Sequence, residues 1–323
     1  MNAHALLTRL RGQIPLLVTA VLLVSMFSIG SVQYEGFFSG QVVLNLLIDN
    51  AFLLVVAVGM TFVILTGGID LSVGAVVALS TMVSAWLVEE HGWSPFLVIP
   101  LVLLMGTAGG WVMGWIIHVF EIQPFIVTLA GMFLARGLCY TISVESISIT
   151  DPTYTSMAQT RIPLGDLFVS PSALIALLVV AAGFVVLHYT KLGRNVYALG
   201  GSEQSALLMG LPVQRTKTTV YAISGFCSAL GGVLLTFYML SGYGLHAVGL
   251  ELDAIAAVVI GGTLLTGGSG YLLGTLLGVL VLGLIQTVIS FQGTLSSWWT
   301  RIVIGALLFV FIVLQRLITA RRR

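Results

Sequence analysis

The sequence contains very few charged residues. Only 8% of its 323 residues are Asp, Glu, Lys or Arg, whereas soluble domains contain about 25%. So little charge cannot cover a water-facing surface, which excludes an ordinary soluble domain. The formal net charge is only +1, so no overall field favours nucleic acid or another highly charged partner. We therefore predict no nucleic-acid partner.

Cysteines and the motifs of catalysis are also scarce. Only two cysteines occur, Cys139 and Cys227, and both lie in apolar runs, which excludes a disulfide framework and favours small buried side chains. There is no G-x-x-x-x-G-K-[ST] loop, no nucleophile elbow and no H-E-x-x-H motif. The five histidines are scattered along the chain. We predict a protein that is not an enzyme, with no catalytic residues, no metal and no cofactor of its own.

Long apolar runs are abundant instead. Hydrophobic residues make up 58% of the chain, and the mean hydropathy is +1.09. A bilayer core needs about 20 apolar residues per helix, and about ten runs meet that rule. They do not alternate apolar and polar residues as a membrane β-barrel does. We predict an all-α, polytopic transmembrane helix bundle that forms one domain over residues 1–323. The runs are centred on 14–32, 43–66, 71–88, 95–119, 124–143, 171–189, 217–240, 252–267, 270–291 and 298–318.

The positions of the basic residues predict an orientation. Arg9 and Arg11 precede the first run, which is longer than the core of a signal peptide and lacks a cleavage site, so it reads as an uncleaved helix. With ten helices and a cytoplasmic N-terminus, all thirteen Lys and Arg residues except Arg136, Arg161 and Arg301 fall in the cytoplasm. Basic residues concentrate in cytoplasmic loops, so we expect both termini to be cytoplasmic.

Two loops are long enough to have structure of their own. Residues 143–171 form a periplasmic loop and residues 190–216 a cytoplasmic loop in this topology. The cytoplasmic loop contains a short predicted helix, because Ser202 suits the N-cap, Glu203 the first turn and Gly210 the position after the end. Its apolar side chains suit either a groove on a partner or the membrane surface. The helix and its flanks comprise Ser202, Glu203, Gln204, Ser205, Ala206, Leu207, Leu208, Met209 and Gly210.

A short internal echo occurs at two cytoplasmic turns. Leu-Thr-Gly-Gly is found at 65–68 and again at 265–268, and Gly74 and Gly274 follow at matching offsets. Membrane transporters often contain repeats whose broken helices meet. An internal repeat and a chance similarity between glycine-rich segments both account for the echo.

Several polar residues lie inside apolar runs and cannot face lipid cheaply. Asp70 can cap the third helix through the amides of Ser72 and Val73, or line a pathway, or do both. Arg136 needs a carboxylate or carbonyl partner, which the sequence does not identify. Near the end of the chain, aromatic residues form either an interfacial belt or a mouth on which a sugar stacks. These residues are Phe291, Trp298 and Trp299.

At these motifs the sequence resembles the permeases of bacterial ABC importers for monosaccharides, the ribose/xylose/arabinose class. Four stretches carry the resemblance: AVGMTFVILTGGIDLSVGAVVAL, QPFIVTLAGMFLARGL, LGRNVYALGGSEQSALLMG and ELDAIAAVVIGGTLLTGGSGYLLGTLLG. Within the class, LIDNAFLLVVAVGMTFVIL, VESISI and FQGTLSSWWTRI are most similar to a permease subunit of galactofuranose importers. The class commonly has Asn at the position of Ser202 and Ala at that of Ser205, which puts the choice of partner in doubt.

The resemblance implies a permease subunit in the bacterial cytoplasmic (inner) membrane. A separate ABC ATPase subunit would bind ATP and dock on the short cytoplasmic helix, which would act as a coupling helix. A second, homologous permease would complete a heterodimer within the lipid membrane, and a periplasmic sugar-binding protein would deliver the sugar. The alternatives are a permease for another monosaccharide such as ribose, and a secondary transporter driven by an ion gradient. We expect the substrate pathway to be lined by Asn50, Asp70, Phe125, Thr128 and Phe291.

Overall fold

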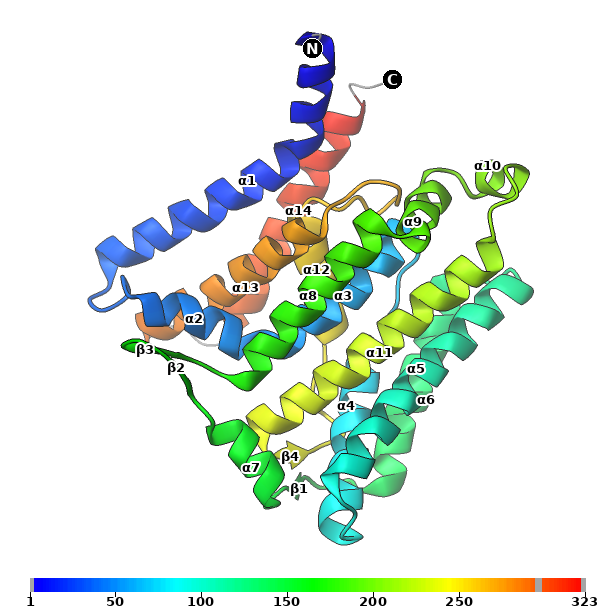
Figure 1. Ribbon diagram of the computed structural model, residues 1–323. Helices are drawn as coiled ribbons and strands as arrows, with labels where there is room; N and C mark the ends of the chain where they lie inside the picture. Colours follow the sequence, from blue (N-terminus) through cyan, green and yellow to red (C-terminus); the bar gives the residue numbers. More distant parts are fainter. Residues whose placement is uncertain (1–2, 294–297, 321–323) are drawn as a thin grey trace.

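Helices dominate the computed structural model, which describes residues 3–293 and 298–320 of the chain (Figure 1). Within these residues the helices are α1 (Ala3–Gln33), α2 (Gly40–Asp49), α3 (Ala51–Leu65), α4 (Val73–Ala85), the π-helix η1 (Trp86–Glu90), α5 (Pro95–Val119), α6 (Pro124–Ile142), α7 (Pro152–Gln159), α8 (Pro171–Tyr189), α9 (Lys191–Gly201), α10 (Glu203–Leu208), α11 (Val213–Met239), α12 (Leu250–Ile260), α13 (Leu272–Gln292) and α14 (Trp298–Ala320). The strands are β1 (Ile147–Ser148), β2 (Ile162–Leu164), β3 (Leu167–Val169) and β4 (Ser241–Gly242).

Proline defines the starts of four helices. Pro95, Pro124, Pro152 and Pro171 are the first residues of α5, α6, α7 and α8. Proline suits this position because its fixed φ is helical and the first amide has no partner inside the helix. At α8 the Oγ of Ser170 also accepts a hydrogen bond from an amide of the first turn. The starts of α5, α6 and α8 agree with the predicted runs at 95–119, 124–143 and 171–189, whereas α7 lies in a segment that was predicted only as a loop.

Every predicted apolar run lies on a helix, but the runs differ in how they cross a membrane. Among the described residues, seven helices are long and apolar enough to span a bilayer, and α2 with α3 makes an eighth if that bent pair is one span. The prediction of a single helix over 43–66 is wrong, because the chain bends by 60° between α2 and α3. The run at 252–267 is helical only in α12, whose 11 residues extend about 16 Å, roughly half of a bilayer core.

Small residues allow the central helix α11 to pack closely against its neighbours. On α5, Gly106, Gly110 and Gly114 recur every fourth residue and lie directly against the α11 backbone. On α11, Gly225 lies against the backbone of α5, so the two helices approach through their glycines. Helix α3 packs on another side of α11 and is buried at every residue except Phe52. The core of the bundle therefore consists of α3, α4 and α11.

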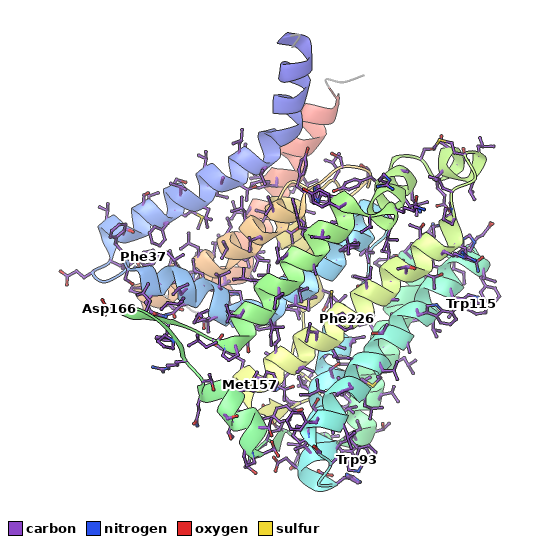
Figure 2. All side chains as sticks on the ribbon, viewed as in Figure 1. Phe37, Trp93, Trp115, Met157, Asp166 and Phe226 are labelled. Carbon is purple, nitrogen blue, oxygen red and sulfur yellow. The ribbon has the colours of Figure 1, made fainter. Side chains whose placement is uncertain are left out.

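The two ends of the bundle differ in structure. In Figure 1 the free end of α1, the C-terminal end of α14 and the helix α10 lie toward the upper part of the view. The opposite end carries α7, the two small antiparallel pairs β1–β4 and β2–β3, and η1. Trp93 and Trp115 lie near the two ends of α5 (Figure 2), as expected for residues that favour the two membrane interfaces.

The segment expected to be periplasmic is well structured. Asp151 caps α7 by accepting hydrogen bonds from the amides of Thr153 and Tyr154, at 2.8 and 3.4 Å. The Glu89 carboxylate at the end of η1 accepts hydrogen bonds from the amides of Thr150 and Asp151, at 2.5 and 2.9 Å. One carboxylate thus fixes the start of α7 to the end of the α4–η1 helix.

Candidate functional site

Helix α10 is about one and a half turns long, is capped by a side chain, and extends from the end of the bundle. Ser202 is its N-cap, and the Ser202 Oγ accepts a hydrogen bond from the Ser205 amide at 3.2 Å. Gly210 follows the helix with a left-handed φ of 72°, which glycine adopts without strain. The start and end of this helix therefore agree with those predicted from Ser202 and Gly210 in the sequence. Its function as a docking helix stays a prediction.

One face of α10 is anchored and the other is free. Ala206 is completely buried against Leu199 and Val213. The Glu203 carboxylate accepts a hydrogen bond from Lys217 at 2.6 Å, which ties α10 to the start of α11. Opposite this anchor, three consecutive apolar side chains project away from the bundle. They are Leu207, Leu208 and Met209, exposed by 53%, 90% and 67%.

Helix α9 joins α10 to the bundle, and the sequence reasoning missed it. The sequence contains a signal for the start of α9, because Thr190 is a favourable N-cap residue. Its side chain accepts a hydrogen bond from the Gly193 amide at 3.3 Å. The Tyr197 hydroxyl donates a hydrogen bond to the carbonyl oxygen of Gly270 at 2.9 Å. Burial raises the pKa of Tyr197 to about 12, with the nearby Tyr271 adding to the effect. The hydroxyl is therefore protonated at neutral pH and remains a donor.

The two Leu-Thr-Gly-Gly turns meet beneath α9. The Gly268 amide donates a hydrogen bond to the Leu65 carbonyl at 2.9 Å, which joins the second turn to the first. Gly67 and Gly267 have left-handed φ angles of 80° and 82°, so the two turns agree at the first glycine. They differ at the second, where Gly268 is left-handed at 73° and Gly68 is not. Gly200, near the end of α9, lies against the same Leu65 carbonyl and leaves no room for a side chain. Three segments distant in sequence converge here.

Asp70 is completely buried at the start of α4. Its Oδ1 accepts hydrogen bonds from the Ser72 amide at 3.0 Å and the Ser72 hydroxyl at 2.6 Å. Its Oδ2 accepts a hydrogen bond from the Ser224 hydroxyl of α11 at 2.7 Å. The contact with the Ser72 amide was predicted from the sequence, but Asp70 is not the N-cap of α4, because Ser72 occupies that position and no side-chain hydrogen bond caps the helix. The contact with α11 was not predicted. Asp70 therefore links the turn before α4 to the central helix.

The structure does not bring the five predicted pathway residues together. Thr128 is buried near Asp70, and its hydroxyl lies 3.3 Å from the Ile69 carbonyl and 2.9 Å from the Pro124 carbonyl. Asn50 lies at the bend between α2 and α3, where its side-chain amide donates to the Leu46 carbonyl at 3.0 Å.

The two aromatic residues of this set lie at the surface. Phe125 is 50% exposed on α6, and Phe291 is 41% exposed near the end of α13. The Phe291 ring packs edge-on against Phe37 with 5.1 Å between the ring centroids. A pathway through all five residues stays a prediction.

Arg136 has the carbonyl partners that the sequence required but did not identify. Its Nη1 donates hydrogen bonds to the carbonyl oxygens of Gly244 and His246, at 2.6 and 2.8 Å. Both carbonyls belong to the segment between β4 and α12. A partly buried guanidinium is favourable when it is hydrogen-bonded in this way, so Arg136 fixes that segment to α6.

Several known permeases are similar to this chain over nearly its whole length. Residues 42–312 match the family described as the branched-chain amino acid transport system / permease component. The inner membrane ABC transporter permease protein YjfF of Escherichia coli (strain K12) is 49% identical over 312 residues, which cover 96% of this chain and 94% of the relative. No solved structure matches.

Two further relatives have names that specify a sugar. The fructose import permease protein FruG of Bifidobacterium longum (strain NCC 2705) is 43% identical over 317 residues, which cover 96% of this chain and 93% of the relative. The ribose import permease protein RbsC of Haemophilus influenzae is 38% identical over 294 residues, which cover 91% of this chain and 90% of the relative. The chain therefore belongs to the family of permease components of branched-chain amino acid transport systems, as a multi-pass inner-membrane permease of the ribose class of ABC sugar importers.

Proposed function

We propose that this chain is the membrane-spanning subunit of an ATP-driven importer for a monosaccharide, with α10 as the contact for a separate ATPase. The supporting observation is the exposed apolar face of α10, formed by Leu207, Leu208 and Met209. Its Ala206 anchor and its ion pair to α11 hold the helix in place, so a force on α10 is transmitted to the bundle.

The assembly that we propose contains two permeases, an ATPase and a periplasmic binding protein. The second permease is a homologous but different chain, as in the galactofuranose importers that the sequence resembles. ATP itself binds to the ATPase subunit, and its effect on transport requires that it favour one state of the whole assembly.

The sugar that we propose is galactofuranose. The stretches LIDNAFLLVVAVGMTFVIL, VESISI and FQGTLSSWWTRI support this choice. The names of the relatives make fructose and ribose the competing substrates. Titration of the partner binding protein with the three sugars distinguishes them, and tight binding of ribose without binding of galactofuranose would exclude our choice.

We further propose ten membrane crossings with both termini in the cytoplasm. Beyond the eight spans above, α14 makes one crossing, and α12 together with the non-helical residues 261–271 makes the other. The free end of α1 and the C-terminal end of α14 lie toward the same part of the molecule as α10 (Figure 1), which supports this orientation. The placement of basic residues supports it as well, because those nearest the two termini and α10 would then be cytoplasmic.

A single substitution on α10 tests the proposed docking. Leu208→Ser removes the most exposed apolar side chain, and full burial of a leucine in an interface stabilises it by about 1.5–3 kcal/mol. We expect the affinity of the ATPase for the purified permease to fall by roughly tenfold or more. Leu164→Ser is the matched control, because Leu164 is 53% exposed on the β2–β3 hairpin at the opposite end.

Two outcomes would contradict the proposal. Unchanged ATPase affinity in Leu208→Ser would exclude α10 as the docking helix. Sugar uptake into proteoliposomes that needs an ion gradient, and continues without ATP, would favour a secondary transporter instead.

A further inference from the structure

A cavity of about 650 Å³, lined by both polar and apolar groups, opens between α12, α13 and α14, and one of its lining residues is Trp298 of the aromatic cluster at the end of the chain. Asp253 lines it from α12, and Gln286 and Ser290 line it from α13. Trp298 and Arg301 line it from the first turn of α14. Its volume lies within the range of about 300–1,000 Å³ that is typical of small-molecule sites.

The position of Gln286 within an apolar helix makes the cavity unusual. Gln286 belongs to α13, one of the helices apolar and long enough to cross a bilayer, yet its side chain is exposed. Ser290, one turn further along the same face, is exposed as well. Polar side chains at this depth are costly when they face lipid, so they normally face water or protein. This face of α13 is therefore suited to a hydrated pathway rather than to acyl chains.

The two charged groups of the cavity, Asp253 and Arg301, do not form a salt bridge with each other. Within the described part of the chain, the ion pair found is that between Lys217 and Glu203, so Asp253 and Arg301 face the same cavity without a salt bridge. Arg301 makes one long contact, 3.4 Å, from Nη2 to the Val248 carbonyl. A carboxylate that accepts and a guanidinium that donates thus remain available to a ligand.

This set of groups fits a neutral ring that carries several hydroxyl groups. Each hydroxyl both donates and accepts, which matches the acceptor Asp253, the donor Arg301 and the amide of Gln286. Trp298 is 71% exposed beside them and offers an apolar ring surface to the C–H face of such a molecule. An acyl chain would satisfy none of the polar groups, and the opposite charges of Asp253 and Arg301 give the cavity no net preference for an anion or a cation.

We propose that Asp253, Gln286 and Arg301 form a binding site for the monosaccharide on its way through the membrane. This inference rests on the proposed function and identifies the residues of this chain that contact the sugar. It differs from the pathway predicted from the sequence, in which Asn50, Asp70 and Thr128 have buried side chains.

Cysteine labelling tests whether the cavity is hydrated. In membranes that contain the complete importer, we expect Gln286→Cys to react with a charged, membrane-impermeant thiol reagent. Active transport of the sugar is expected to slow that reaction severalfold. Leu178→Cys is the matched control, because Leu178 is 69% exposed on α8 within an apolar span and should stay unlabelled. Cys139 and Cys227 are buried and contribute no background.

Transport kinetics test the contact with the sugar. We expect Asp253→Asn to raise the KM for sugar uptake about tenfold, which corresponds to about 1.4 kcal/mol, with normal assembly and maximal rate. The control Glu121→Gln alters an exposed carboxylate in the α5–α6 turn and should leave the KM unchanged.

The outcomes separate this inference from the proposed function. The binding site would be overturned if Gln286→Cys stays unlabelled, if sugar does not slow its labelling, or if Asp253→Asn leaves the KM unchanged. An unchanged KM together with poor assembly would show that this surface is a contact between permeases. A wild-type importer that takes up no monosaccharide with ATP would overturn the proposed function, and this inference with it.

Discussion

Asp70 illustrates how a buried charge is stabilised in a bundle that has few charges. Its carboxylate is inaccessible to solvent and is surrounded by hydrogen-bond donors from Ser72 and Ser224. Burying a carboxylate costs free energy unless such donors replace water. The donors come from two helices, so the carboxylate also fixes the position of α4 relative to α11.

Removal of the donor from α11 should destabilise the protein. In Ser224→Ala the Asp70 Oδ2 loses the hydrogen bond of 2.7 Å, and an unsatisfied buried group costs about 1–3 kcal/mol. We expect a lower midpoint of thermal unfolding in detergent. Ser25→Ala is the control, because that exposed serine bonds only to the Leu22 carbonyl of its own helix. Equal midpoints for the two variants would show that the carboxylate has other support.

At the residue scale, the sequence predicts local contacts and misses distant ones. The Asp70–Ser72 contact spans two residues, and the cap of α10 by Ser202 spans three, so both follow from sequence order. The Ser224 contact spans 154 residues, and Arg136 reaches carbonyls more than 100 residues away. Such partners depend on which helices pack together, which one sequence does not specify.

At the scale of helices, adjacent glycines of α5 have opposite environments. A Cβ added at Gly110 would collide with the Tyr221 carbonyl of α11, whereas a Cβ at Gly109 would meet no atom within 4 Å. We expect Gly110→Ala to force the helices apart and to destabilise the protein by about 1–3 kcal/mol. Gly109→Ala should be neutral or slightly stabilising, because alanine is the better helix former.

Unfolding of the two variants in detergent with increasing denaturant provides the comparison. The substitutions have identical chemistry and lie one residue apart, so a difference between them reports only the helix contact. If Gly110→Ala unfolds at the same denaturant concentration as Gly109→Ala, the close approach of α5 and α11 does not contribute to stability.

Most of the helices could be predicted from the sequence, and so could the interruption of the run at 252–267 by its glycines, but the bend inside the run at 43–66 could not. Apolar length and proline placement predict α5, α6 and α8 closely, because each is a continuous span with a clear start. The bend at Asn50 has no proline to mark it, and the only local signal is the polar pair Asp49–Asn50 inside the apolar run. The early end of α12 is produced by Gly261 and Gly262, of which the second has a φ of 92°.

At the scale of the whole molecule, α9 connects the proposed ATPase contact to the sugar cavity. Its last turn lies against the first Leu-Thr-Gly-Gly turn, and its Tyr197 hydroxyl binds the Gly270 carbonyl just before α13. Helix α13 carries Gln286 into the cavity. A displacement of α10 therefore reaches α13 through packed backbone and one hydrogen bond, which is the kind of physical connection that coupling between sites requires.

Loss of that hydrogen bond should weaken coupling without abolishing docking. Tyr197→Phe removes only the hydroxyl that donates to Gly270, and one such bond contributes about 0.5–1.5 kcal/mol. We expect ATPase affinity to be unchanged, while the number of sugar molecules imported per ATP hydrolysed falls by about two- to tenfold. Tyr140→Phe is the matched control, because Tyr140 is 43% exposed on α6, outside the connection from α10 through α9 to α13. A normal ratio of transport to hydrolysis in Tyr197→Phe would mean that force passes from α10 to the bundle directly through α11, by way of the Glu203–Lys217 ion pair.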